Sequence, residues 1–432
     1  MKKTATHLSL WLTLGLSLLT FPVRCALHPL TDVFDLQGES KENTVEYLIM
    51  GTLLSNLSLI PVFSLDDSLT YYSAQSITVT TGNAAATIHY TLDGSNPDCS
   101  STPYTGPIVA PANAVTEIRA LGCVTDENGT RSSSISQAVY VMAPVLIGSY
   151  NTPSQAFASA ISGDYAFVAD WGLSDLRIVD ISDPKNPSPA LQYNPFGNAR
   201  AIHLDGTRIY LSMHGNGWLA YDITGAPFAT LLGSHDPGGT TYDVDVEGNI
   251  LFAATSGGVR AIDISAIGSA STLGTDFSSA AEAVEAEGTL VFAARTGNGF
   301  QVLDFSVPSS PLVIGTYGST NATDVKIDQN LAYVADGSGG LLVLDISDPA
   351  APSLLGSYAI AMDAYKLDVI GTTVAVADMS AGLKLFDVSN PTSPALLVTY
   401  PMTGPTNGVT IDANYVYVSD DVNGFFILRY KK

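Results

Sequence analysis

The stretch GGLLVLDISDPAAPSLLGSY, residues 339–358, decides the fold because close copies of it recur along the chain. Residues 174–193 read SDLRIVDISDPKNPSPALQY, and residues 381–400 read AGLKLFDVSNPTSPALLVTY. The residue that ends the apolar run recurs every 41 or 42 positions, at Asp180, Asp222, Asp263, Asp304, Asp345, Asp387 and, in the seventh place, Arg429. So regular a period over seven units indicates one structural unit per repeat.

Each repeat contains four short segments with the composition of β-strands. In the fifth repeat they are ATDVKI (322–327), LAYVAD (331–336), LLVLDI (341–346) and SLLGSY (353–358). Four strands in 41 or 42 residues fit a blade of a β-propeller, whereas a parallel β-helix has a shorter repeat and an array of immunoglobulin (Ig)-like domains a longer one. We therefore predict an all-β protein in which residues 143–432 form a seven-bladed propeller with four-stranded blades.

The last repeat ends with GFFILRYKK at Lys432 and lacks its fourth strand. The stretch PVLIGSY, residues 144–150, matches the fourth-strand sequence PSLLGSY and precedes the first full repeat. We predict that this N-terminal strand pairs with the seventh blade, because a ring closed in this way leaves no open end.

Residues 61–142 have a different pattern, with short alternating strands such as SITVTT and ATIHYTL separated by turns such as DGSNPD. This pattern predicts a small antiparallel Ig-like β-sandwich. Cys99 and Cys123 lie in this segment, at a spacing that two strands could bridge, and we expect them to form a disulfide.

Both regions resemble known families. TYYSAQSITVTT, ATIHYTLDGSNPD, PYTGPI and TEIRAL resemble the Ig-like domain at the C-terminus of chitobiase and β-hexosaminidase. That resemblance implies an accessory module without catalytic residues, common in exported and often carbohydrate-related proteins. The repeats, above all YVADGSGGLLVLDISDPAAPSLLGSY, are similar to the LVIVD repeat of bacterial and archaeal envelope proteins, although FAATSGGVRAIDISAIGSASTLG departs from it by losing the proline pair. This second resemblance implies a propeller and names no activity.

The N-terminus predicts export. Residues 1–25 combine Lys2 and Lys3 with the apolar run LSLWLTLGLSLLTF, which is too short for a comfortable membrane span. Residues 26–60 are interpreted as a spacer. Cys25 is a candidate lipid-attachment residue, but Arg24 stands where a lipoprotein signal needs a small neutral residue, so ordinary cleavage near Ala26 is the alternative. We expect a monomer at the cell surface or secreted, with no transmembrane span in the mature chain.

Composition excludes one class of partner. The net charge of −23 opposes binding to nucleic acid, which needs clustered Lys and Arg. No motif nominates a metal or a cofactor. The recurring Asp of VLDIS is interpreted as a turn residue, since a catalytic group would not be repeated in six blades. The calcium-loop-like DVDVEGN, residues 243–249, is interpreted as a strand entering a hairpin, because the same columns of the other repeats carry hairpin sequences.

Differences between the repeats nominate two candidate sites. The loop after the second strand reads Asp170, Met213, Thr255, Arg295, Asp336, Asp378 and Asp420, and the next column adds Trp171, His214 and Asp421. We predict a ligand-binding sector of Asp170, Trp171, His214, Asp420 and Asp421, since a ring beside carboxylates can stack on a sugar or a cation. The alternative is that Asp favours hairpin loops and Trp171 packs on its neighbour.

The second candidate site lines the axis of the ring. The innermost strands place Ala160, His203, Asp245, Glu285, Lys326, Asp368 and Thr410 in one column. We expect the polar members of this column to line the channel, where the alternative is an ordinary water-filled interior.

Two functions remain open at this point. The first is a non-enzymatic envelope protein whose propeller is a binding scaffold for a protein or a glycan. The second is an extracellular hydrolase or lyase that acts on a glycan or an ester at the channel mouth. The absence of nucleophile and metal motifs from the sequence favours the first.

Overall fold

The computed structural model describes residues 57–431, except 128, 173–175, 195–197, 320 and 360–361. The expected signal, the spacer up to residue 56 and Cys25 therefore lie outside the described residues. The described part is all-β, with one 3-10 turn, η2 (Ile267–Ser269). None of the helices in the described residues is long and apolar enough to cross a membrane.

The repeats fold into seven four-stranded antiparallel sheets. Six of them are formed by four consecutive strands each and are numbered here in chain order. The first sheet contains β12 (Gln155–Ser162), β13 (Tyr165–Trp171), β14 (Leu176–Asp180) and β15 (Ser188–Tyr193), and the second contains β16 (Ala201–Asp205), β17 (Arg208–Ser212), β18 (Trp218–Asp222) and β19 (Thr230–His235). The third contains β20 (Thr241–Glu247), β21 (Ile250–Thr255), β22 (Gly258–Asp263) and β23 (Ser271–Asp276), and the fourth contains β24 (Ala283–Glu287), β25 (Leu290–Arg295), β26 (Gly299–Asp304) and β27 (Leu312–Tyr317). The fifth contains β28 (Asp324–Asp328), β29 (Leu331–Ala335), β30 (Leu341–Asp345) and β31 (Ser353–Tyr358), and the sixth contains β32 (Ala364–Ile370), β33 (Thr373–Asp378), β34 (Gly382–Asp387) and β35 (Ala395–Tyr400).

The seventh, here called the closing sheet, combines strands from both ends of the repeat region. It contains β36 (Thr406–Ile411), β37 (Tyr415–Asp420), β38 (Gly424–Arg429) and β11 (Val145–Tyr150). Strand β11 runs antiparallel to β38, with Val145 opposite Arg429 and Tyr150 opposite Phe425. The predicted pairing of PVLIGSY with the last repeat is therefore confirmed.

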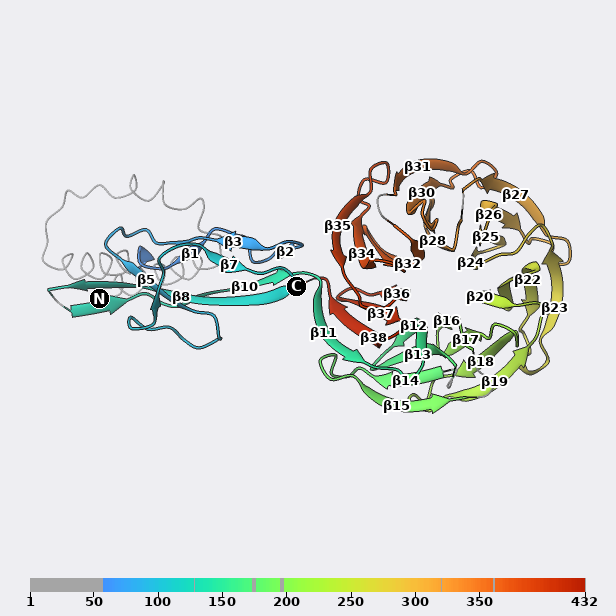
Figure 1. Ribbon diagram of the computed structural model, residues 1–432, viewed down its shortest axis with the longest axis horizontal. Coiled ribbons are helices and arrows are strands. Elements are labelled where there is room, and N and C mark those ends of the chain that lie inside the picture. The colour runs from blue at the N-terminus through green and yellow to red at the C-terminus, as the bar shows by residue number, and fades with distance from the viewer. Residues whose placement is uncertain are drawn as a thin grey trace, which may run out of the picture.

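The sheets are arranged in a ring. Figure 1 shows the first strand of each sheet at the centre and the fourth strand at the circumference. Each central strand contacts the central strand of the next sheet, and β36 contacts β12, so the series of contacts returns to its start. Apolar side chains fill the space between neighbouring sheets, as Phe167 and Leu176 do against Ile209 and Leu219.

A glycine in the fourth strand sets how closely neighbouring sheets approach. In five sheets, the Cβ that an alanine would add at this position would lie 2.0–2.6 Å from a backbone carbonyl oxygen in a turn of the next sheet. Such a distance is shorter than any van der Waals contact, so the position accepts no side chain. The pairs are Gly148 with Pro184, Gly233 with Ile267, Gly274 with Pro308, Gly315 with Pro349, and Gly356 with Pro391.

The recurring aspartate stabilises the turn that receives this glycine. Each of Asp180, Asp222, Asp263, Asp304, Asp345 and Asp387 accepts the backbone N–H of the residue two positions later, at 2.7–2.9 Å. These are Asx turns. The interpretation of this aspartate as a turn residue is confirmed.

The N-terminal region is a two-layered domain. One sheet has the order β2 (Thr70–Tyr71), β10 (Ser136–Met142), β8 (Ala114–Asp126), β5 (Thr87–Thr91) and β6 (Thr102–Pro103), and β9 (Gly129–Ser132) pairs with β8. Two short pairs complete the domain, β1 (Val62–Phe63) with β4 (Val79–Thr80), and β3 (Gln75–Ile77) with β7 (Ile108–Ala110). The core between them includes Ile77, Ile118 and Tyr140. Unlike the antiparallel pattern that we expected, β2 and β10 run parallel.

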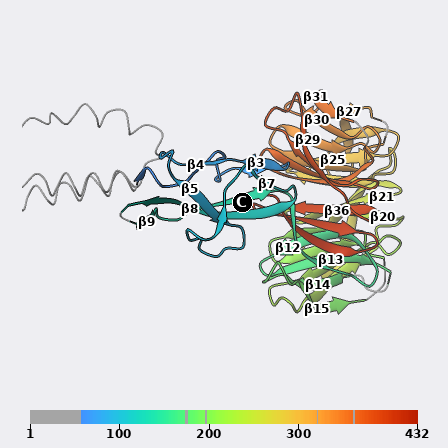
Figure 2. The ribbon, with the colours of Figure 1, turned by 60° about the vertical axis from the view of Figure 1, so that its left-hand side comes forward.

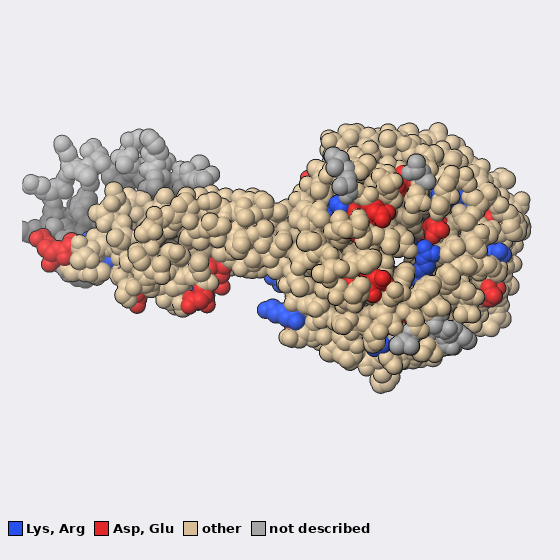
Figure 3. Space-filling model, viewed as in Figure 1, with Lys and Arg blue, Asp and Glu red and all other residues tan. Residues whose placement is uncertain are grey.

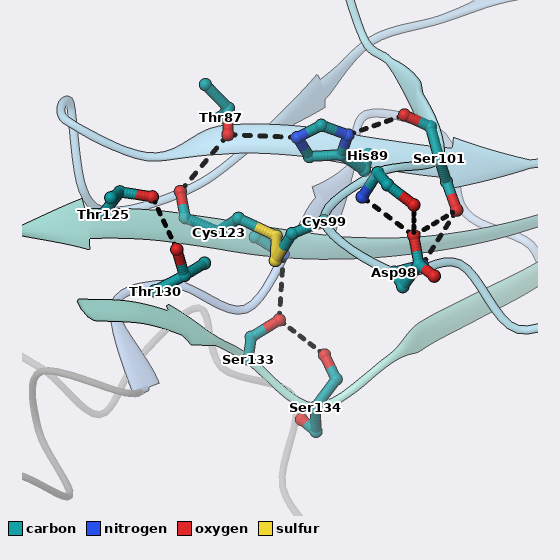
Figure 4. Close-up of a disulfide and its surroundings, with 12 residues drawn as sticks. Thr87, His89, Asp98, Cys99, Ser101, Cys123, Thr125, Thr130, Ser133 and Ser134 are labelled. Atoms are coloured by element: carbon teal, nitrogen blue, oxygen red, sulfur yellow. Dashed lines mark hydrogen bonds between the residues drawn. A yellow bond between two sulfur atoms is a disulfide. The ribbon is translucent and has the colours of Figure 1, made fainter.

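The predicted disulfide between Cys99 and Cys123 is present. It links the segment between β5 and β6 to the central strand β8, as Figure 4 shows. His89 of β5 supports the same segment, since its Nδ1 lies 2.8 Å from the carbonyl oxygen of Ser101. The bridge therefore holds a segment with little strand pairing of its own.

The Ig-like domain contacts the ring at the junction of the sixth and closing sheets, and Figure 2 shows it extending to one side of the ring. Tyr72 packs against the core between these sheets, as Val398 and Met402 also do, and its hydroxyl donates a 3.4 Å hydrogen bond to the carbonyl oxygen of Tyr430. Burial, and then the charge of Asp387, raise the pKa of Tyr72. Val398 occupies the position at which five other sheets have the close-packed glycine.

The close approach at Gly315 predicts a stability defect on substitution. Gly315→Val should lower the free energy of unfolding by about 1–3 kcal/mol or more, since the new side chain would overlap the Pro349 carbonyl. Thr316→Val, at the exposed neighbouring position, should change it by less than about 0.5 kcal/mol. Urea denaturation of both variants measures the difference, and equal stabilities would refute the proposed constraint.

The contact of Tyr72 predicts that the Ig-like domain stabilises the ring. Tyr72→Ala should lower the stability of the repeat region by about 1–3 kcal/mol, because it removes a partly buried ring. Tyr72→Phe keeps the packing and should cost less than about 1 kcal/mol. Hydrogen exchange of β35 and β38 can be followed in both variants. Unchanged exchange in Tyr72→Ala would mean that the domain does not support this junction.

Candidate functional site

Two kinds of loop meet at one end of the ring, here called the mouth. The loop after the second strand of a sheet pairs with the start of the central strand of the next, as His214 does with Thr241 and Gly337 with Ala364. These pairings place the two kinds of loop on one face of the ring, as the predicted binding sector requires. Side chains from both kinds of loop can therefore form one site.

The aspartates of the loop column are buried at this end. Asp170, Asp378 and Asp420 have no exposed surface, and Asp336 is 3% exposed. Asp420 accepts hydrogen bonds from the backbone N–H groups of Val422, Asn423 and Gly404 at 2.8–3.1 Å. Asp170 forms an ion pair of 3.3 Å with buried Arg177.

This burial corrects part of the predicted binding sector. Asp170 and Asp420 were expected to present carboxylates to a ligand, but both are buried: Asp170 is paired with Arg177, and Asp420 binds backbone N–H groups of its own loop. Asp421 remains partly exposed, and its Oδ1 lies 3.5 Å from Nδ2 of Asn407. Hydrogen-bonding needs of a hairpin loop, rather than of a ligand, explain the acidic column.

Trp171 and His214 do come together, within a group that we call the aromatic arc: Phe157, Trp171, His214 and Tyr242. The ring centroids of Trp171 lie 5.2 Å from Phe157 and 4.9 Å from His214, and His214 lies 6.0 Å from Tyr242. All four side chains are partly exposed. Burial, and then the charge of Arg200, lower the pKa of His214 and favour its neutral imidazole. The arc thus presents rings from the first three sheets at the mouth.

Arg200 extends this arc across the mouth. Its guanidinium lies 4.4 Å from the ring centroid of Tyr242. Its Nη2 donates hydrogen bonds to Oε2 of Glu282 at 2.9 Å and to the hydroxyl of Tyr365 at 3.0 Å. Arg200 precedes the second sheet, Glu282 precedes the fourth and Tyr365 belongs to the sixth. Because these sheets are not neighbours, the contacts span the channel.

Five residues at the mouth were not predicted from the sequence. Phe157, Arg200, Tyr242, Glu282 and Tyr365 each stand three positions before a residue of the predicted channel column, and strict alternation would place them on the opposite face of the strand. A register shift moves Phe157, Tyr242 and Tyr365, which lie at bulges in β12, β20 and β32. Arg200 and Glu282 lie just before their strands begin. The concentration of large polar and aromatic residues in this column was the available signal.

Below the mouth, the predicted channel residues contact one another in pairs. His203 Nδ1 lies 2.6 Å from Oδ1 of Asp245, and Lys326 Nζ lies 2.8 Å from Oε2 of Glu285. Lys366, which was not predicted from the sequence, also faces the channel carboxylates: its Nζ lies 3.0 Å from Asp324 and 3.7 Å from Asp243. Figure 3 shows acidic and basic side chains around the opening in the middle of the ring.

The channel carboxylates also link neighbouring sheets. Three of them accept a backbone N–H from the central strand of the next sheet: Asp245 from Ala286 at 2.6 Å, Asp324 from Leu367 at 2.9 Å, and Asp368 from Ile411 at 2.9 Å. At the junction of the closing and first sheets, Thr410 Oγ1 donates to the carbonyl of Ser159 at 2.7 Å. These contacts give the channel column a structural role.

The acidic stretch at residues 243–249 lies in β20 and its hairpin with β21, where Gly248 has a φ of 60°. Its interpretation as a strand entering a hairpin is confirmed. Within the part of the chain that the structure describes, no three His, Cys, Asp or Glu side chains are arranged to hold a metal ion.

The channel predicts a pH dependence of stability. Burial raises the pKa of Glu285 to about 7, against an ordinary value of 4.5, although Lys326 opposes the shift. The folded protein therefore keeps a proton that the unfolded chain has lost, and stability should fall as the pH rises from about 4.5 to 7, by about 1–3 kcal/mol from this group.

Glu285→Gln should remove the contribution of this carboxyl to the pH dependence. The free energy of unfolding of the variant should therefore rise relative to that of the wild type as the pH increases from 5 to 8. Glu287→Gln, at an exposed position of the same strand, is the control. Urea denaturation across this pH range measures both. Parallel curves for wild type and Glu285→Gln would contradict the assignment.

Comparison with known proteins agrees with this architecture. The LVIVD repeat family matches residues 156–195, 238–274, 279–320, 319–360, 363–401 and 403–428, which together make up more than half of the chain. Residues 67–136 match the chitobiase/β-hexosaminidase C-terminal domain. No curated protein matches the chain.

Among solved structures, the computationally designed Ika8 protein has a similar fold. The two share 11% identity with a TM-score of 0.52, over 67% of this chain and 100% of the designed one. The second sheet, with Arg200 just before it and His214 in one of its loops, lies between the segments that the repeat family matches. The chain belongs to the LVIVD repeat family and carries a chitobiase/β-hexosaminidase C-terminal domain ahead of its repeats.

Proposed function

We propose that this chain is an exported, non-enzymatic protein of the cell envelope, in which a seven-bladed propeller binds a protein or a glycan at its mouth. The seven sheets are the blades, and β11 completes the last of them. The Ig-like domain, residues 61–142, carries the propeller, residues 143–432. The protein acts as a monomer and needs no cofactor.

Export is supported by three observations. The Cys99–Cys123 disulfide suits an oxidising compartment. The first 25 residues have the charge and hydropathy of a signal peptide. The LVIVD repeat and the chitobiase/β-hexosaminidase C-terminal domain are both typical of exported proteins. Retention at the membrane through a lipid on Cys25, or release after cleavage near Ala26, would both present the ring outside the cell.

The main support for the binding role is that corresponding positions at the mouth hold different residue types in different repeats. A residue needed only to form a blade should recur in every blade, as the Asx-turn aspartate does in six. In contrast, the column that supplies Phe157 and Tyr242 has Thr323 in the fifth sheet and Asn407 in the closing sheet. The loop column that supplies Trp171 has Ser256 in the third sheet. The aromatic arc therefore belongs to one sector of the ring.

Partly exposed aromatic rings beside an arginine are the residue types that dominate binding surfaces. The arc groups four rings with Arg200 within one sector, and each ring keeps some surface in contact with solvent. A large ring left in water without a partner is unfavourable, so a group of them supports a site that is covered on binding. The net charge of −23 opposes nucleic acid as the partner.

The proposal predicts that binding depends on the arc. Full-length mature protein would be immobilised and exposed to envelope extract of the source cell, and the retained proteins and glycans quantified. The double variant Trp171→Ala, His214→Ala should retain at least about tenfold less of the specific partner. Phe277→Ala is the control, because Phe277 is 77% exposed in a loop outside the arc. Equal retention by both variants and the wild type would place binding elsewhere.

A further inference from the structure

We infer that the ligand of the mouth is an uncharged carbohydrate, with a pyranose ring against the aromatic arc and its hydroxyls on Arg200 and Glu282. This inference rests on the proposed function and selects the glycan among its two kinds of partner. Three features of the mouth lead to it: the stacking surface, the unused hydrogen-bonding atoms of the Arg200–Glu282 pair, and the balance of charge.

The stacking surface suits a sugar ring. One face of a pyranose carries several C–H groups and is apolar, so it packs on an aromatic ring while its hydroxyls point outward. Trp171 and Tyr242 belong to different sheets and are joined through His214, whose ring lies 4.9 Å from the first and 6.0 Å from the second. The neutral imidazole favoured by the lowered pKa of His214 can stack without adding a charge.

The Arg200–Glu282 pair retains hydrogen-bonding capacity. A guanidinium has five N–H donors. Within the described residues, both hydrogen bonds of Arg200 come from Nη2, and Glu282 uses only Oε2. This leaves Nε and Nη1 as donors and Oε1 as an acceptor, on side chains that are 13% and 22% exposed. A donor beside an acceptor is what two adjacent hydroxyls need, because each hydroxyl both donates and accepts.

The charges at the mouth favour a neutral ligand. Glu282 already balances Arg200, and Lys366 below them is shared between Asp324 and Asp243. An acidic sugar would bring its carboxylate near these three acids, and an amino sugar would bring its ammonium near Arg200. Like charges placed near one another at a binding site oppose binding. A hydroxylated, uncharged ring meets neither penalty.

The test uses the full mature chain and a glycan array with neutral, uronic-acid and amino-sugar members. The neutral glycan with the strongest signal is then titrated by intrinsic fluorescence. Trp171 and Trp218 are the tryptophans of the described residues, and Trp218 is fully buried, so a change on titration reports on Trp171. Saturation-transfer NMR on the same glycan provides a readout that does not need tryptophan.

We expect neutral glycans to bind and the charged analogues of the same sugar to bind at least about tenfold more weakly. Trp171→Ala should weaken the neutral glycan by at least about tenfold. Arg200→Lys, which keeps the charge and loses the planar fork, should weaken it several-fold with little change in melting temperature. Phe277→Ala should leave binding within about twofold of the wild type.

Two results would overturn the inference. One is a preference for a charged sugar, or neutral binding that is unaffected by Trp171→Ala and Arg200→Lys. The other is the absence of any glycan binding, together with a protein partner that is retained by the wild type and lost in the arc variant. That second result would leave the proposed binding role in place and exclude the carbohydrate. Loss of both kinds of binding in the wild type itself would instead refute the proposed function.

Discussion

The contact between a fourth-strand glycine and a turn of the next sheet is the constraint on which the ring depends. A carbonyl oxygen 2.0–2.6 Å from an added Cβ leaves no room for a side chain, so five pairs of sheets meet at the same close spacing. Both halves of the contact lie in one repeat, since the turn follows the third strand and the glycine lies in the fourth. Where the contact is present, the turn of a sheet packs against the glycine of the preceding sheet.

The two exceptions show how the contact is replaced. In the first sheet the equivalent residue is Leu191, which packs against the same core cluster as Ala226, in a turn of the second sheet that lacks the usual Asp-Pro sequence. In the sixth sheet it is Val398, and the closing sheet beyond it receives β11 from outside the repeats in place of a turn. Tyr72 of the Ig-like domain packs at that junction. The domain is thus connected to the ring by packing as well as by sequence.

The repeats predicted the seven four-stranded sheets, the pairing of β11 with the last repeat and the turn role of the recurring aspartate. Each of these follows from a pattern that recurs along the chain. The disulfide also followed from spacing and context. The candidate site was predicted only in part. Trp171 and His214 were found because they differ from the other repeats, whereas the loop aspartates were misread, since exposure cannot be inferred from residue type in a loop that hydrogen bonds to itself. Arg200, Tyr242 and Tyr365 were missed because bulges and strand ends, which depend on neighbouring sheets, changed the face that they occupy.

A fold built of repeats can form one specific site if the residues near its centre differ from one repeat to the next. The channel shows how this is possible here, because its linking hydrogen bonds use different residues in different sheets: Asp245 and Asp324 accept from the next strand, while Thr410 donates at the junction with the first sheet. The first sheet has Ala160 in this column, where the other sheets have polar residues. Near the axis, many residue types satisfy the same backbone groups, whereas at the circumference only glycine fits in five sheets. Sequence variation is therefore tolerated toward the centre of the ring, and the aromatic arc and Arg200 lie there, at the end where loops from three sheets meet.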